Sequence, residues 1–202
     1  MFELHALRDL FARTPGQRLG PEPYTADFEE RFRRIGTDGF WKLECRQDYQ
    51  EHGFPSWEAF REGDWTGALK LIDDLRPEFE RDRAQLVAAG IGHHRVRVVT
   101  EPLSPYVQWE LHILHAKDHY GENVRVLTTA QAPDLPDLVV LGDEAVYDVH
   151  HTGDGTPAGA TRYTDTPLVR AARTLVQRLH TSGEPLRSYF PRAVAGPTPP
   201  CG

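Results

Sequence analysis

Alternating apolar and polar positions predict a strand, a turn and a long helix in the middle of the chain. The valines within residues 96–99 are β-branched and suit a pleated sheet, and Arg95 and Arg97 alternate with them. Residues of one parity leave a strand on the same face, so both guanidinium groups should share a face. Pro102 cannot donate to a strand ladder, so we expect the pairing to stop there.

The residues that follow predict a helix over residues 105–120. Ser104 before Pro105 is a common helix start, because serine caps the helix and proline lacks an N–H that would be unpaired. Apolar residues fall on two stripes, which is typical of a helix packed between a sheet and a further layer. The stripes are Val107, Leu111 and Leu114, and Trp109, Ile113, Ala116 and Tyr120.

The same reasoning extends to the rest of the chain and predicts an α/β protein with a mixed central sheet and helices on its faces. Residues 40–45 and 123–127 read as strands, and the second completes a βαβ unit with a parallel strand pair. Residues 138–141 and 145–151 flank a hairpin turn, and residues 160–163 follow as a third antiparallel strand. Helices are expected over residues 64–89, divided or kinked at Pro77, and from about residue 166 to Gly183. The core residues expected in the first of these helices are Trp65, Leu69, Ile72, Leu75, Phe79, Leu86 and Val87.

The two ends of the chain are expected to differ from the α/β domain of residues 38–190. Residues 1–37 form an N-terminal helical extension with amphipathic helices at 2–13 and about 25–35, joined by a connector. Their apolar faces pack either on the main domain or on a second copy, which would make a homodimer. Residues 191–202 are rich in Pro, Gly and Ala, and we expect a disordered tail.

Charge and cysteine content exclude several classes of protein. The net charge is −7 and the arginines are scattered among acids, which argues against direct nucleic-acid binding. No segment approaches the ~20 apolar residues of a membrane span, and the N-terminus lacks a secretory signal pattern. Cys45 and Cys201 cannot form a disulfide framework or a thiolate zinc site, so a cytoplasmic protein without a cofactor is expected.

Three sequence motifs carry a family resemblance. FWKLECRQDY (40–49), RVRVVTEPLSPYVQWEL (95–111) and RYTDTPLV (162–169) together resemble an uncharacterised actinobacterial family of unknown function. Its members are often encoded beside helix-turn-helix regulators, so the resemblance implies such a regulator as partner. The C-terminal half also resembles the phospholipase D-like effector domains of regulators. Their H-x-K pair has one match, His115 and Lys117, which we interpret as coincidental because it lies in a predicted helix and has no second copy.

The candidate binding site groups polar residues around the end of the central strand. Arg95 and Arg97 suit a carboxylate or phosphate, and Glu101 and Glu110 could line the same pocket or pair with the arginines. Ser104 adds free N–H groups at a helix start. In open α/β sheets ligands favour the carboxyl ends of the strands. Tyr106, Trp109, Tyr163 and Asp165 could complete the pocket, although core packing and helix capping are the ordinary roles of such residues.

These candidates leave three hypotheses about function. The first is a non-enzymatic regulatory protein that binds a helix-turn-helix partner or a small anionic ligand. The second is a transferase or hydrolase of specialised metabolism on a degenerate phospholipase D-like scaffold, with the Arg and Glu residues as its pocket. The third is a metal-binding protein through His112, His115 and His119, but no fourth ligand is evident, so we predict no metal.

Overall fold

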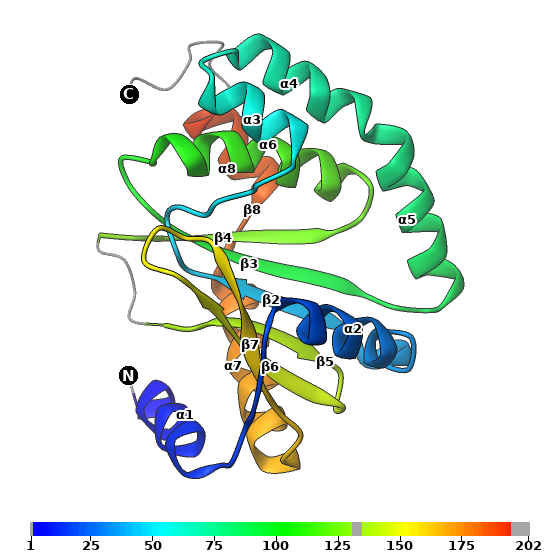
Figure 1. The fold of residues 1–202 in the computed structure, drawn as a ribbon, viewed down its shortest axis with the longest axis vertical. Coiled ribbons are helices and arrows are strands. Elements are labelled where there is room, and N and C mark those ends of the chain that lie inside the picture. The colour runs from blue at the N-terminus through cyan, green and yellow to red at the C-terminus, as the bar shows by residue number, and fades with distance from the viewer. Residues whose placement is uncertain (1, 131–134, 195–202) are drawn as a thin grey trace.

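The structure is a computed structural model that describes residues 2–130 and 135–194, apart from the side chains of residues 2–6 and 38. It confirms the predicted α/β class, because one mixed sheet has helices on both faces (Figure 1). The helices are α1 Phe2–Arg13, α2 Pro21–Phe32, α3 Pro55–Arg61, α4 Trp65–Asp74, α5 Arg76–Ala88, α6 Pro105–His119, α7 Thr166–Ser182 and α8 Leu186–Ala193, with a short 3-10 turn at Gly36–Asp38. The strands are β1 Gln17–Leu19, β2 Phe40–Glu44, β3 His93–Thr100, β4 Asn123–Thr129, β5 Asp137–Leu141, β6 Ala145–His151, β7 Pro157–Tyr163 and β8 Glu184–Pro185.

The eight strands of the described chain lie in the order β1-β7-β6-β5-β2-β3-β4-β8. Strands β2, β3 and β4 are mutually parallel, which confirms the βαβ unit built from β3, α6 and β4. The remaining neighbours are antiparallel, including the predicted hairpin of β5 and β6.

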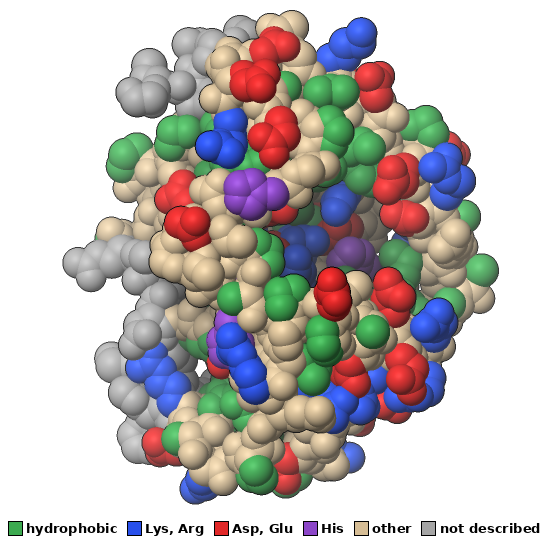
Figure 2. Space-filling view, viewed as in Figure 1, with side chains coloured by type: hydrophobic (Ala, Val, Ile, Leu, Met, Phe, Trp, Pro, Cys, Tyr) green, Lys and Arg blue, Asp and Glu red, His purple; other side chains and the backbone are tan. Residues whose placement is uncertain are grey.

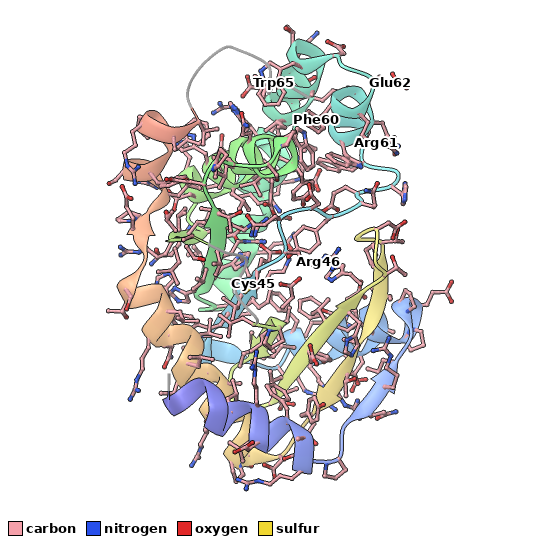
Figure 3. The ribbon with its side chains drawn as sticks, turned by 90° about the vertical axis from the view of Figure 1, so that its left-hand side faces the viewer. Cys45, Arg46, Phe60, Arg61, Glu62 and Trp65 are labelled. Carbon is pink, nitrogen blue, oxygen red and sulfur yellow. The ribbon has the colours of Figure 1, made fainter. Side chains whose placement is uncertain are left out.

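The two faces of the sheet carry different helices. Helix α7 covers one face over β2, β3 and β5, and α1 packs outside it through Leu7, Leu10 and Phe11. On the other face, α6 covers β3 and β4 together with α8, and α3 and α4 pack on α6. Figure 3 places Phe60 and Trp65, at the α3–α4 turn, at the end of the molecule away from α1 and α7. Helix α2 lies on this second face too, over the antiparallel half of the sheet.

Two hydrophobic clusters on the second face leave a seam between them. The cluster under α2 includes Phe40 and Tyr147, and the cluster under α6 includes Val99 and Val126. Register places the residues between them on this face, because Phe40 pairs with His93 and Lys42 pairs with Arg95. The seam is therefore built from the polar positions of β2 and β3.

Several predicted boundaries were wrong. The expected connector contains strand β1, which pairs with β7 at the edge of the sheet, and α2 begins at Pro21 rather than near residue 25. The predicted division of the helix over residues 64–89 is confirmed, although the two helices meet at Leu75 and Pro77 lies in the first turn of the second. Val87, expected in the core, is 57% exposed. The first two helices bury their apolar faces within the chain, so the homodimer stays an untested prediction.

The C-terminal end also differs from expectation. The sequence pattern missed α8, which carries the buried residues Leu186, Tyr189 and Phe190 and reaches Ala193, inside the expected tail. Helix α8 contains Pro191, whose missing N–H is tolerated because the helix is short and few backbone hydrogen bonds are lost. The rest of the expected tail, including Cys201, lies outside the described residues.

Candidate functional site

Seven charged side chains occupy the seam and the adjoining end of α6, and we call them the charged seam. They are Lys42, Glu44, Arg95, Arg97, Glu110, Lys117 and Glu122. Arg95 lies between two carboxylates, donating from Nη1 to Glu44 at 2.5 Å and from Nε to Glu122. Lys42 pairs with the other oxygen of Glu44 at 2.6 Å.

Arg97 is fully buried and bonds to the helix above it. Its Nε donates to Glu110 of α6 at 2.6 Å, and its Nη1 donates to the Val98 carbonyl at 2.8 Å. Its guanidinium carbon also lies 5.6 Å from the ring centroid of Tyr49. Its Nη2 atom is buried and has no hydrogen-bond partner among the described residues. The Arg97–Glu110 pair therefore joins β3 to α6.

Burial and pairing shift the pKa values of the carboxyl groups in opposite directions. Burial alone would raise the pKa of Glu122, but Arg95 and His93 outweigh it and lower the pKa to about 2. The same competition, with Arg95 and Lys42 as the cations, lowers the pKa of Glu44. Burial dominates at Glu110, whose pKa is raised although Arg97 opposes the shift. Glu44 and Glu122 are thus ionised at neutral pH.

One end of the charged seam opens into a cleft of about 460 Å³ between α2 and α5. Its walls are mostly apolar and come from Phe28, Phe32, Phe40, Phe79, Leu86 and Tyr120. Figure 2 shows the hollow in this face, with basic, acidic and histidine side chains at its floor. Cavities of this size and lining are typical of small-molecule sites, which usually combine apolar walls with a few polar groups.

His93, Lys117 and Glu122 are the polar residues at the floor of the cleft. The His93 ring stacks on Phe40 with centroids 4.5 Å apart, and burial lowers its pKa to about 4, so it is neutral at pH 7. Its Nε2 lies 3.3 Å from a Glu122 oxygen, but the angles do not make a hydrogen bond. Burial also lowers the pKa of Lys117, while Glu122 opposes that shift.

A protein family matches most of the length of the chain. The family described as "Domain of unknown function (DUF6879)" matches residues 26–191, which include the whole cleft and the charged seam. The chain belongs to the DUF6879 family. No curated protein and no solved structure matches it. The DUF6879 match therefore identifies the family but no activity.

The DUF6879 fold brings together three of the nine predicted site residues. Arg95 and Arg97 share a face, as the strand parity predicted, and Glu110 bonds to Arg97. Glu101 lies elsewhere, where it is exposed and accepts a hydrogen bond from the Tyr189 hydroxyl at 2.9 Å. Because Arg95 and Arg97 already bind carboxylates of the chain, they are poorly placed to bind an external anion.

The other predicted site residues have visible structural roles. Ser104 caps α6 by accepting from the Val107 N–H at 3.1 Å, and Asp165 caps α7 by accepting from the Leu168 N–H at 3.0 Å. Tyr106 and Trp109 lie in the aromatic layer beneath α3, where their polar atoms donate to Glu51 and Ser56. Tyr163 lies in the cluster under α7 and contacts Phe11 edge-on. Their part in ligand binding stays a prediction that no geometry here supports.

The cleft lies at the amino ends of the parallel strands, whereas the sequence predicted a site at their carboxyl ends. At the carboxyl ends of β2 and β3, the side-chain amide of Gln47 bonds to Cys45, Val98 and Thr100 and closes the edge. The cleft instead opens beside His93 at the start of β3. Sequence reasoning missed His93, Lys117 and Glu122 as a group. The signal available was a lysine beside an apolar stripe and a carboxylate just after the helix-ending Gly121.

The histidines of α6 make aromatic contacts. His112 lies edge-on to Trp65 and Phe190, His115 stacks on Phe190 with centroids 4.1 Å apart, and His119 is exposed. Among the residues that the structure describes, no group of three His, Cys, Asp or Glu side chains could hold a metal ion. Lys117 and His115 also diverge, since Lys117 faces Phe79 in the cleft and His115 faces α8. No described helix is long and apolar enough to cross a membrane.

Proposed function

We propose that this protein binds a small organic molecule in the cleft between α2 and α5 and acts without catalysing a reaction. The observation that carries the proposal is the cleft itself, with its volume of about 460 Å³, its aromatic walls and its charged floor. A partner would respond to the bound state, and the helix-turn-helix regulator implied by the sequence resemblance is our candidate. A cytoplasmic location suits this role, because the buried Cys45 thiol is unpaired.

The charge pairing in the floor favours binding over catalysis. A general base near neutral pH needs a pKa close to 7, whereas Glu122 has a pKa of about 2 and His93 a pKa of about 4. Arg95 lowers the pKa of Glu122 against the effect of burial, whereas burial is the main cause of the low pKa of His93. Among the described residues, no serine, threonine or cysteine lines the cleft, so a hydroxyl or thiol nucleophile is not evident there. The transferase or hydrolase alternative therefore has less support than the binding function.

The position of the cleft also suits a protein that signals ligand binding to a partner. Its two sides come from α2 and α5, which are separated in the chain by the whole of β2, α3 and α4. Helix α5 carries one buried residue, Phe79, and its outer face is charged. A ligand that touches both helices adds contacts between them. Binding would therefore reduce the motion of α5 relative to α2, which a partner could detect.

Filling the cleft tests this function. The substitution Ala89→Trp places a large side chain in the cleft lining, and it should weaken binding of the neutral apolar fluorophore N-phenyl-1-naphthylamine by more than tenfold. Val87→Trp is the matched control, because Val87 lies two residues away, is exposed and does not line the cleft. Equal affinity of the two variants, or no binding by the unmodified protein, would contradict the proposed function.

A further inference from the structure

One cation of the charged seam has no salt-bridge partner among the described residues. The cations of the seam are Lys42, Arg95, Arg97 and Lys117, and its carboxylates are Glu44, Glu110 and Glu122. The first three cations each have a salt bridge of 2.6 Å or less with one of those carboxylates. Lys117 has none within the part of the chain that the structure describes, so its ammonium group is the unpaired cation of the seam.

The surroundings of Lys117 direct that charge toward the cleft. The side chain leaves α6 in its last turn, lines the cleft, and places Nζ 5.6 Å from the ring centroid of Phe79. Glu122 is the neighbouring carboxylate, but its Oε1 already accepts from Arg95 Nε and lies against His93. The described part of the chain therefore leaves the hydrogen-bonding capacity of this ammonium largely unused, and a partly buried cation is stabilised by a paired anion.

The rest of the cleft indicates the body of the ligand. Its walls contain four phenylalanines and a tyrosine, so a flat aromatic ring can stack or meet them edge-on. The one unpaired ammonium group at the floor, that of Lys117, matches a single negative charge. A phosphate dianion would leave one uncompensated negative charge in a partly buried site, which is unfavourable. Arg33 and Arg83 also line the cleft, but both are exposed, so solvent screens them.

We propose that the ligand is an aromatic carboxylic acid whose carboxylate pairs with Lys117 at the floor of the cleft, with its ring between α2 and α5. This inference rests on the proposed function, because it names the ligand class of the same cleft. It also assigns Lys117 as the specificity-determining residue. The arginines of the central strand hold the floor in place instead of contacting the ligand.

A comparison of charged and neutral probes tests the pairing. Calorimetric titration with 2-naphthoate and with 2-naphthamide, which has nearly the same shape without the charge, should show tighter binding of the acid. Lys117→Met should weaken naphthoate binding on the order of 10- to 100-fold, the loss of one charge-assisted hydrogen bond, and change naphthamide binding little. Lys70→Met is the matched control, because Lys70 is exposed on α4 and does not line the cleft.

The outcomes separate this inference from the proposed function. Equal binding of acid and amide, each weakened by Ala89→Trp, would overturn the role of Lys117 and keep the cleft as a binding site. Failure of both probes would count against the cleft as well. Chemical protection of Lys117 in the unmodified protein tests the same pairing without relying on a variant that could misfold. The chain has three lysines, at positions 42, 70 and 117, and naphthoate should slow reductive methylation of Lys117 and leave Lys70 unchanged, as read by mass spectrometry. No protection of Lys117 would overturn the proposal.

Discussion

Removing either partner of the Arg97–Glu110 pair should destabilise the protein, but with a different dependence on pH. Arg97 is fully buried and Glu110 nearly so, and their atoms are 2.6 Å apart. A guanidinium group cannot give up its proton in a protein, whereas a buried carboxyl can become neutral by taking one up. Glu110→Leu therefore leaves a buried charge that cannot be neutralised, and Arg97→Met leaves one that can.

The magnitudes follow from this asymmetry. Breaking a buried pair around a permanent charge costs about 3–5 kcal/mol, and we expect that loss for Glu110→Leu at both pH 5 and pH 7. For Arg97→Met, protonating Glu110 from a reference pKa near 4.3 costs at most about 3.7 kcal/mol at pH 7 and about 1 kcal/mol at pH 5. The Val98 carbonyl loses its bond from Arg97 but keeps the one from Gln47, which adds little to the cost.

The pKa of Glu110 sets the sign of the pH dependence. Burial already raises the pKa of Glu110 in the folded protein, and Arg97 opposes that shift, so removing Arg97 raises the pKa further. The folded Arg97→Met variant then holds a proton that the unfolded chain releases. Its stability should therefore fall as the pH rises from about 4 toward 7, relative to the unmodified protein.

Urea unfolding at pH 5 and pH 7, followed by tryptophan fluorescence, measures these differences. The double variant Arg97→Met with Glu110→Leu should be within about 2 kcal/mol of the unmodified protein, because apolar replacement of a buried pair is often neutral. Equal losses for both single variants at both pH values would refute the argument. So would a double variant whose loss equals the sum of the two single losses.

Two further predictions concern positions away from the charged seam. Gly159→Ala should cost more than about 1 kcal/mol and loosen β1, because its φ is +85° and a Cβ atom would lie 2.1 Å from the Leu19 carbonyl oxygen. Gly63→Ala is the control for backbone strain, because Gly63 has the same φ and no described atom lies within 4 Å of its added Cβ. Equal losses of stability for the two variants would show that Gly159→Ala causes no collision. Asp165→Ala should cost about 1 kcal/mol in thermal unfolding through the lost α7 cap and leave naphthoate affinity unchanged. A loss of affinity would restore Asp165 as a site residue.

The sequence pattern predicted features that depend on neighbouring residues along one element. The parity of Arg95 and Arg97 placed them on one face, and the Ser104–Pro105 start fixed where α6 begins. These predictions succeeded because strand parity and helix capping are set by local backbone geometry. The same reasoning failed where local signals compete, as at Val87, whose apolar side chain lies on the exposed side of α5.

The candidate site depended mostly on contacts between distant elements. The sequence suggested that the arginines could pair with glutamates, but it could not identify Glu44 and Glu122 as the partners of Arg95. Those residues come from the preceding strand and the following loop, 51 and 27 positions away. Which residues meet across such distances is decided by strand order and helix placement, since burial of the whole core selects them.

The amino-acid order by itself thus determined the α/β class, the βαβ unit and the common face of the two central arginines. Only the tertiary structure decided that these arginines form salt bridges with carboxylates of the chain, whereas Lys117 forms none among the described residues. It also decided that the cleft lies at the start of β3, because Gln47 closes the other edge and α2 and α5 pack apart from each other. Periodicity is a property of one segment, but a cavity is the space that several segments fail to fill.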